Sequence, residues 1–358
     1  MDLNEPRGSA APGRGSDPPV KPAPGPAAGL NAGLTWQASG AWATEHYSVF
    51  ILLLLVIVGA ILSPAFLGIR NLQNIGLQTS IFGLVTLAEF LVVLTHGIDI
   101  SVGSVVGLSG VLGAGLFGGS NVFVAVLIGV GVGALVGVIN GYLIAYRALE
   151  PFIVTLGMLS LARGLVYVYT QGMPMQPSAN DFSTVANLYV IGIPVEFLIW
   201  VAFIFIVSFV LRHTVFGRRV YAVGSSADAA RAAGVPVRNT LFLVYLIAGM
   251  LSGLAGFLLA AQVEVGTPTA GNLYELTAIA GVVIGGTRLA GGKGSVFNTV
   301  VGTLIFGGIT DLLVLLNINT FETEAFTGGL ILGVLFLMSL HMPKWFPGRS
   351  SRAHRSPV

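Results

Sequence analysis

The sequence consists of long apolar runs separated by short polar segments, and ten of these runs are candidates for membrane-spanning helices. A helix needs roughly 20 apolar residues to cross about 30 Å of hydrocarbon. The runs are continuous rather than alternating, which favours helices over the strands of a membrane barrel. They lie near residues 47–67, 73–95, 102–118, 121–146, 152–171, 193–211, 240–262, 274–287, 295–316 and 325–341. The pattern predicts an all-α polytopic membrane protein of about ten transmembrane helices.

Some of the predicted spans are broken or short. The run over 47–67 is strong, whereas those near 73–95, 102–118 and 274–287 are weak, because they are short or interrupted by glycine. Two polar, glycine-rich breaks, 97–104 and 285–295, separate neighbouring runs. Non-helical backbone at membrane depth is tolerated only where it faces protein or water, and transporters often place such breaks on the solute path.

The composition supports a membrane protein. Hydrophobic residues make up 54% of the 358 residues and charged residues only 9%, whereas a soluble domain is about one quarter charged. The absence of cysteine excludes disulfides, thiolate catalysis and cysteine-ligated metal sites. The net charge of +2 does not indicate nucleic-acid binding, and the five histidines lack metal-ligand spacing. No cofactor is expected.

The basic residues predict the orientation in the membrane. With the N-terminus in the cytoplasm and alternating spans, every lysine and arginine except Arg70 and Arg163 falls on the cytoplasmic side. Both termini are therefore expected to be cytoplasmic. Residues 1–45, rich in Pro, Gly and Ala, are predicted to form a disordered tail without a signal peptide, and 344–358 a second tail. The transmembrane domain then covers 46–343.

The longest predicted cytoplasmic loop, 212–238, contains a short helix. Ser225 or Ser226 suits its N-cap, Asp228 suits the positive end of the helix dipole, and the alanines that follow favour helix. Gly234 ends it. A helix of about two turns is unstable by itself in water. We therefore expect it to dock, with its small side chains in a partner's groove, or else to be an ordinary ordered loop.

Three stretches resemble the permease subunits of ABC importers for ribose and related sugars, within the ribose/branched-chain amino acid permease superfamily. They are Gly97–Ser104 (GIDISVGS), then Asn140-Gly141 with 151–165, and 217–235. With the span order, the resemblance covers roughly residues 46–341.

The resemblance implies partners and a location. It implies a cytoplasmic ATP-binding subunit, an extracytoplasmic solute-binding protein, a second permease copy and the prokaryotic cell membrane. It also implies that the predicted loop helix is the coupling helix on the ATP-binding subunit. The coupling residues are then Ala227, Asp228, Ala230, Arg231 and Gly234.

The chain itself is not expected to bind ATP. The nearest match to a phosphate-binding loop, Thr287–Gly294, has Thr where the first Gly belongs and Gly where Ser or Thr belongs. It also connects two spans rather than a strand and a helix. We therefore predict a transporter subunit that is not an enzyme, with ATP hydrolysis on another polypeptide.

Polar residues within or beside the spans are candidates for the translocation path, because ionisable groups in hydrocarbon usually face a bundle interior. Glu89 lies in the middle of a span, as does Asp311, and each is either an ion-coupling group or a neutral packing residue. Arg163 pairs either with a carboxylate or with backbone carbonyls. The path candidates are Glu89, Asp99, Ser101, Asn140, Thr155 and Arg163.

The many glycines have two interpretations. Small residues allow membrane helices to pack closely, and this role is expected for Gly129, Gly131, Gly133, Gly137, Gly249 and Gly253. The likeness of Gly103-Ser104-Val105 to Gly294-Ser295-Val296 is either a trace of an internal repeat or chance in a glycine-rich chain.

The leading functional prediction is an ABC importer permease for a sugar or similar small solute. An ion-coupled secondary transporter, in which Glu89 or Asp311 titrates, is the alternative from another class. An ABC permease for branched-chain amino acids is the nearest alternative within the class. A membrane enzyme lacks any catalytic constellation in this sequence. The outward loop 172–193 either meets the solute-binding protein or only connects two spans.

Overall fold

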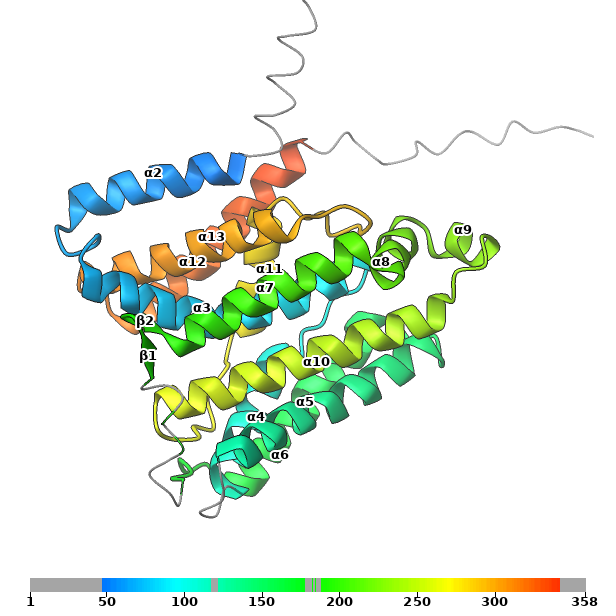
Figure 1. The fold of residues 1–358 in the computed structure, drawn as a ribbon, viewed down its shortest axis with the longest axis horizontal. Helices are drawn as coiled ribbons and strands as arrows, with labels where there is room; N and C mark the ends of the chain where they lie inside the picture. Colours follow the sequence, from blue (N-terminus) through cyan, green and yellow to red (C-terminus); the bar gives the residue numbers. More distant parts are fainter. Residues whose placement is uncertain (1–46, 117–121, 178–181, 183, 185–187, 342–358) are drawn as a thin grey trace, which may run out of the picture. The chain divides into compact units, whose positions relative to one another are not determined.

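The computed structural model describes residues 47–116, 122–177, 182, 184 and 188–341, so both predicted tails lie outside it. Its helices are α2 (Tyr47–Leu62), α3 (Ile69–Leu94), α4 (Val102–Leu116), α5 (Val122–Ala145), α6 (Pro151–Thr170), α7 (Val195–His213), α8 (Val215–Ser225), α9 (Ala227–Ala232), α10 (Val237–Gln262), α11 (Tyr274–Ile284), α12 (Val296–Leu315) and α13 (Thr320–His341). Strands β1 (Tyr189–Val190) and β2 (Ile193–Pro194) form one antiparallel hairpin. The predicted all-α class is confirmed for the described residues (Figure 1).

Each predicted apolar run coincides with a helix, while α8 and α9 lie in the predicted cytoplasmic loop. Six helices of the described chain, α3, α5, α6, α7, α10 and α12, are long and apolar enough to cross a membrane. Three further apolar helices, α2, α4 and α11, are shorter. The runs near 102–118 and 274–287 are thus helices of reduced length, and the total of ten spans stays a prediction.

Several runs differ from prediction at one end, and two of these differences have a clear local cause. The first helix stops at Leu62, because Pro64 disfavours helical backbone at the residue before it. The run over 193–211 becomes helical only at Val195. Ile191 and Gly192 have φ angles of 52° and 77°, which suit the two-residue turn of a β-hairpin and delay the helix.

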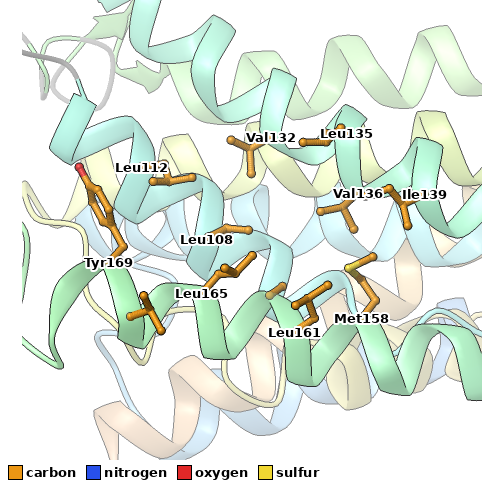
Figure 2. A pocket seen from close by; sticks show the side chains of 12 residues that line it. Leu108, Leu112, Val132, Leu135, Val136, Ile139, Met158, Leu161, Leu165 and Tyr169 are labelled. Carbon is orange, nitrogen blue, oxygen red and sulfur yellow. The ribbon is translucent and has the colours of Figure 1, made fainter.

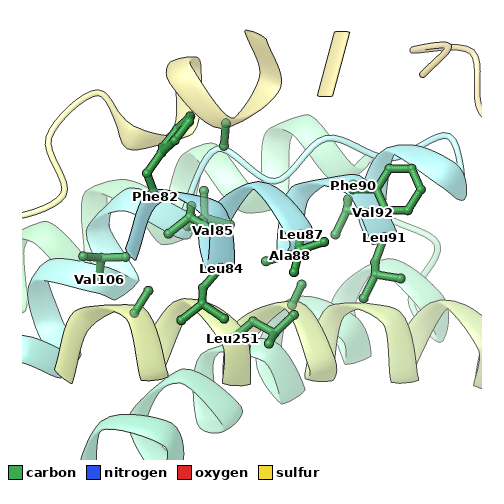
Figure 3. Packing of buried hydrophobic residues seen from close by; sticks show 14 of the residues in the cluster. Phe82, Leu84, Val85, Leu87, Ala88, Phe90, Leu91, Val92, Val106 and Leu251 are labelled. Atoms are coloured by element: carbon green, nitrogen blue, oxygen red, sulfur yellow. The ribbon is translucent and has the colours of Figure 1, made fainter. Parts of the chain in front are cut away.

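Helices α3 and α10 form the centre of the described bundle. Every residue of α3 from Thr79 to Leu94 is buried, as expected for a helix that is apolar on all sides. Figure 3 shows Leu84 of α3 directed towards Leu251 of α10. Phe82 packs against Phe306 of α12, with ring centroids 5.5 Å apart. Helix α3 packs against α11 and α12, and α10 packs against α4 and α5, so the central pair joins the two halves of the bundle.

A long–short–long order of helices occurs twice. Helices α3, α4 and α5 have 26, 15 and 24 residues, and α10, α11 and α12 have 26, 11 and 20. A non-helical segment, 95–101 or 263–273, precedes each short helix. α3 ends where α10 begins, beside α8 and α9, so the two triplets run in opposite directions (Figure 1). Inverted repeats with broken helices are common in transporters.

The likeness between Gly103-Ser104-Val105 and Gly294-Ser295-Val296 does not follow this pattern. The first triplet belongs to α4, whereas the second lies at the start of α12 rather than of α11. The repeated order of helices pairs α4 with α11, whereas the sequence likeness pairs the start of α4 with the start of α12.

Helices α5 and α10 approach at backbone distance through glycine. A Cβ atom on Gly133 would overlap the carbonyl oxygen of Gly249, and Gly129 and Gly137 meet α10 in the same way. Close packing is thus confirmed for these glycines. Gly131 is an exception, because nothing lies within 4 Å of its Cβ direction. Two residues turn a helix by about 200°, which places Gly131 on the opposite face from Gly133.

Candidate functional site

A polar loop, residues 95–101, folds back between α3 and α4. The backbone N–H of Ser101 donates to Asp99 Oδ1 at 2.9 Å, and the Ser101 hydroxyl donates to the same oxygen at 2.6 Å. Asp99 thereby forms an Asx turn directly before α4, where the helix dipole favours a negative charge. This turn accounts for an acidic residue between two apolar helices.

Side chains from three helices, α3, α5 and α6, hold the same loop. Glu89 of α3 accepts a hydrogen bond from the Asp99 backbone N–H at 3.2 Å. The Asn140 amide of α5 donates to Ser101 Oγ at 3.0 Å, and the Thr155 hydroxyl of α6 donates to a loop carbonyl at 3.3 Å. Five predicted path residues therefore meet in one group, the loop cluster: Glu89, Asp99, Ser101, Asn140 and Thr155.

The loop cluster is closed in this structure, because all five of its side chains are buried. Glu89 Oε2, Asn140 Oδ1 and the Tyr245 hydroxyl are also buried and have no hydrogen-bond partner within the described residues. An orphaned buried polar atom costs about 1–3 kcal/mol. The hydrogen-bonding groups of the cluster are therefore only partly paired.

Glu89→Gln is expected to leave stability nearly unchanged, whereas Glu89→Ala is expected to cost about 1–3 kcal/mol. The glutamine oxygen still accepts the bond from the Asp99 backbone, whereas alanine leaves that buried donor unpaired. Thermal unfolding of the two variants in detergent measures the difference. Equal destabilisation of both would show that the charge of Glu89, and not its hydrogen bond, is what the fold requires.

Arg163 lies apart from the loop cluster. Its guanidinium Nη1 donates to the carbonyl oxygens of Pro268 and Ala270, at 2.8 and 2.9 Å. Of the two predicted pairings, the one with backbone carbonyls is confirmed. Arg163 thereby ties α6 to the non-helical segment that precedes α11.

The predicted coupling loop contains two helices rather than one. Thr214 caps α8 by accepting from the Gly217 N–H at 3.2 Å, and Ser226 caps α9 by accepting from the Ala229 N–H at 3.2 Å. Gly234 follows α9 with a φ of 78°. The sequence analysis missed α8, although Thr214 followed by the buried pair Val220 and Val223 is a cap followed by an apolar face.

The two sides of α9 have different surroundings. Ala230 is buried against Val223 of α8 and Val237 of α10. Asp228 and Arg231 face outward and form an ion pair of 2.9 Å with each other. The outward face, which we call the α9 face, consists of Asp228, Ala229, Arg231, Ala232 and Ala233. Ala230 thus docks within its own chain, and the half-buried Ala227 packs against the same cluster. Asp228, Arg231 and Gly234, the other predicted coupling residues, are exposed.

The end of α8 is fastened to the end of α3. A Cβ atom on Gly224 would overlap the carbonyl oxygen of Leu94, and the Gly292 N–H donates to that same oxygen at 3.0 Å. The Tyr221 hydroxyl donates to the Gly294 carbonyl at 3.0 Å. Burial raises the pKa of Tyr221, with Arg212 acting in the opposite direction, so this donor stays protonated at neutral pH.

We call this contact of Gly224, Leu94 and Gly292 the cytoplasmic junction, after the predicted cytoplasmic loop to which Gly224 belongs. Leu94 ends α3 directly before loop 95–101, and Gly292 belongs to the break between α11 and α12. Ser226 caps α9 immediately after α8 ends. The α9 face and the loop cluster are therefore connected through a few residues of ordered backbone.

An apolar groove of about 400 Å³ lies between α4, α5 and α6 (Figure 2). Leu108, Val132, Met158 and Leu165 point into it, and Tyr169 closes one end. Its walls carry almost no hydrogen-bonding groups, so it does not fit a polar ligand.

Comparison with known proteins places these features in a family. A family model described as branched-chain amino acid transport system / permease component matches residues 71–340. The ribose import permease protein RbsC of Escherichia coli (strain K12) is 39% identical over 78% of this chain and 89% of its own length. The D-allose transport system permease protein AlsC of the same strain is 36% identical, over 86% and 93%. The L-arabinose ABC transporter permease protein AraH of Azospirillum brasilense is 34% identical, over 83% and 89%. No solved structure matches the chain.

Proposed function

We propose that the chain carries a monosaccharide in an ABC importer, because it belongs to the family described as branched-chain amino acid transport system / permease component. It is a multi-pass cell membrane protein and a permease subunit rather than an enzyme. Ribose, allose and arabinose, named in its relatives, are neutral polyhydroxylated molecules of similar size. These relatives support the sugar importer and neither the amino-acid nor the ion-coupled alternative.

The observation that carries the proposal is that the α9 face is exposed and lies directly beside the cytoplasmic junction. A six-residue helix contributes little stability by itself. Its outward alanines leave backbone and small side chains accessible to a partner, while Ala230 anchors it to α8 and α10. We infer that a separate ATP-binding subunit docks here and moves α8, and with it the end of α3.

The segment nearest to a phosphate-binding loop supports a separate ATPase. Within Thr287–Gly294, the Gly292 N–H is already bonded to Leu94, and the Arg288 N–H is bonded to the Lys293 carbonyl. A phosphate-binding loop needs such N–H groups free to cradle phosphate. This segment therefore serves the cytoplasmic junction in our proposal.

We propose the remaining partners from the opposite end of the bundle. If α9 is cytoplasmic, the hairpin of β1 and β2 lies outside, and Ile191 at its tip is 97% exposed. An extracytoplasmic solute-binding protein would dock on this side. A second permease copy would complete the pore, and both termini would be cytoplasmic.

Uptake into proteoliposomes tests the function. The purified chain, its ATP-binding subunit and its binding protein are expected to accumulate radiolabelled ribose, allose or arabinose only when ATP is enclosed with the ATP-binding subunit. The chain without these subunits should not accumulate sugar under a proton gradient. Accumulation by the chain alone would overturn the proposal in favour of ion coupling.

Ala229→Trp and Ala232→Trp are expected to lower ATP-driven uptake by roughly tenfold or more, because an indole on the α9 face obstructs a closely packed interface. The amount of folded chain should not change, since neither side chain is buried. Uptake and co-purification of the ATP-binding subunit measure the effect. Ala325→Trp, at an exposed alanine near the start of α13, is the matched control. Normal co-purification in both α9 variants would contradict docking on this face.

A further inference from the structure

Segment 263–273 enters the membrane region as irregular chain. Gly266 pairs with Met175, just beyond the end of α6, whereas Ala270 contacts Gly107 and Gly271 contacts Gly103, near the start of α4. Successive residues therefore lie progressively deeper along α4. Irregular backbone at this depth is tolerated only where it is buried in protein or lines a water-filled cavity.

The glycines of α4 make room for this segment. A Cβ atom on Gly107 would lie 2.8 Å from the Ala270 carbonyl oxygen, and one on Gly103 would overlap the Gly271 carbonyl oxygen. Arg163 holds the other side through the carbonyls of Pro268 and Ala270. The segment is thus fixed between α4 and α6, and these contacts determine the path of its backbone.

Towards α11 the segment exposes two polar side chains, with Leu273 exposed beside them. Thr269 and Asn272 are exposed, and Glu275, in the first turn of α11, is half-buried beside Gly103. On α6, Ser160 and Tyr167 are exposed on the same face as the half-buried Arg163, because they lie three residues before it and four after it. Arg163 lies near enough to Tyr167 on its own helix and to Glu275 of α11 to interact electrostatically with both.

This surface differs from the lipid-facing sides of the bundle. On α7, Phe205 and Phe209 are 71% and 61% exposed, as suits contact with acyl chains. An arginine, a carboxylate and an amide in contact with hydrocarbon would cost several kcal/mol. The apolar groove between α4, α5 and α6 lacks such groups, so it does not serve the same purpose.

We propose that Ser160, Arg163, Tyr167, Thr269, Asn272 and Glu275 line the aqueous path of the sugar, an assignment that rests on the proposed function. Together these side chains offer hydrogen-bond donors and acceptors. Each hydroxyl of a neutral polyhydroxylated solute can both donate and accept a hydrogen bond, so the solute can pair with both kinds of group. Two of the five N–H groups of Arg163 suffice for its backbone bonds, and the others remain for the solute. The sequence analysis named Arg163 but missed Glu275, whose only signal is an acidic residue at the start of an apolar run.

Cysteine reactivity tests the path without any partner. The chain has no cysteine, so Thr269→Cys and Asn272→Cys each introduce a single thiol. In membranes containing the full chain, a charged, membrane-impermeant thiosulfonate is expected to modify these thiols at least tenfold faster than Phe205→Cys or Phe209→Cys. Slow modification at all four positions would overturn the proposal, and would indicate that lipid or a second copy covers this face.

Transport by the reconstituted importer provides the second readout. Asn272→Ala and Glu275→Gln are expected to lower ribose uptake at least tenfold at unchanged protein levels, whereas Phe205→Ala should not lower it. Unchanged uptake in both path variants would also overturn the assignment. If the thiols react but the wild-type chain imports no monosaccharide, the proposed function fails while the aqueous path stands. If the wild-type chain imports sugar but the thiols do not react, only the path assignment fails.

Discussion

Gly224→Leu is expected to lower sugar uptake by at least about tenfold. Its side chain would have to occupy the space of the Leu94 carbonyl, so α8 must separate from the end of α3 and break the cytoplasmic junction. The α9 face is not touched by the substitution. We therefore expect the ATP-binding subunit still to bind and hydrolyse ATP, without driving transport. Uptake and ATPase activity of the same reconstituted complex measure this uncoupling.

Val215→Leu is the control on the same helix, because this side chain is exposed at the opposite end of α8, away from the contact with Leu94 and Gly292. It should retain most uptake. Tyr221→Phe, which removes one bond to the break before α12 while keeping the ring, should have an intermediate effect. Wild-type uptake by Gly224→Leu would show that α8 does not transmit motion through this contact.

Gly133→Leu is expected to prevent the chain from folding. At this position α5 touches the Gly249 carbonyl and the Cα atom of Gly253, and neither backbone atom can move without displacing α10. Overpacking a core costs about 1–3 kcal/mol, and more where backbone is in the way. The amount of chain that elutes as a single species in detergent, and its midpoint of thermal unfolding, measure the loss.

Gly131→Leu is the control on the same helix, two residues away. Nothing lies within 4 Å of its Cβ direction, so the leucine should project from α5 without displacing a neighbour. We expect expression and unfolding temperature close to those of the wild-type chain. If both variants failed equally, the cause would lie in the loss of glycine from α5 and not in its contact with α10.

The features with a local signal could be predicted from the sequence. The helices follow continuous apolar runs, and α9 follows a serine cap and alanines. Glu89, Asp99, Ser101, Asn140 and Thr155 could be chosen because polar groups are conspicuous among apolar neighbours. Their convergence on one loop could not, because it depends on how α3, α5 and α6 pack.

The residues that the sequence analysis missed act through tertiary contact. Gly224 is one of many glycines until the Leu94 carbonyl lies against it, and Tyr245 resembles any aromatic residue in an apolar helix. The error at Gly131 has the same origin, since spacing identifies a small residue but not the face that meets a partner. Segment 263–273 reads as a connection between two spans, and only its contacts with α4 reveal its depth.

Helix α10 gives the molecule a mechanical property. It begins at Val237, which packs on the anchor of α9, and ends directly before segment 263–273. Its 26 residues form one continuous helix about 39 Å long, at about 1.5 Å per residue. Tilting a helix of this length by about 5° about one end displaces its other end by about 3 Å, which is comparable to the width of a hydroxyl group. If the ATP-binding subunit moves α9 as proposed, α10 would transmit that motion directly to segment 263–273 at the far end of the bundle.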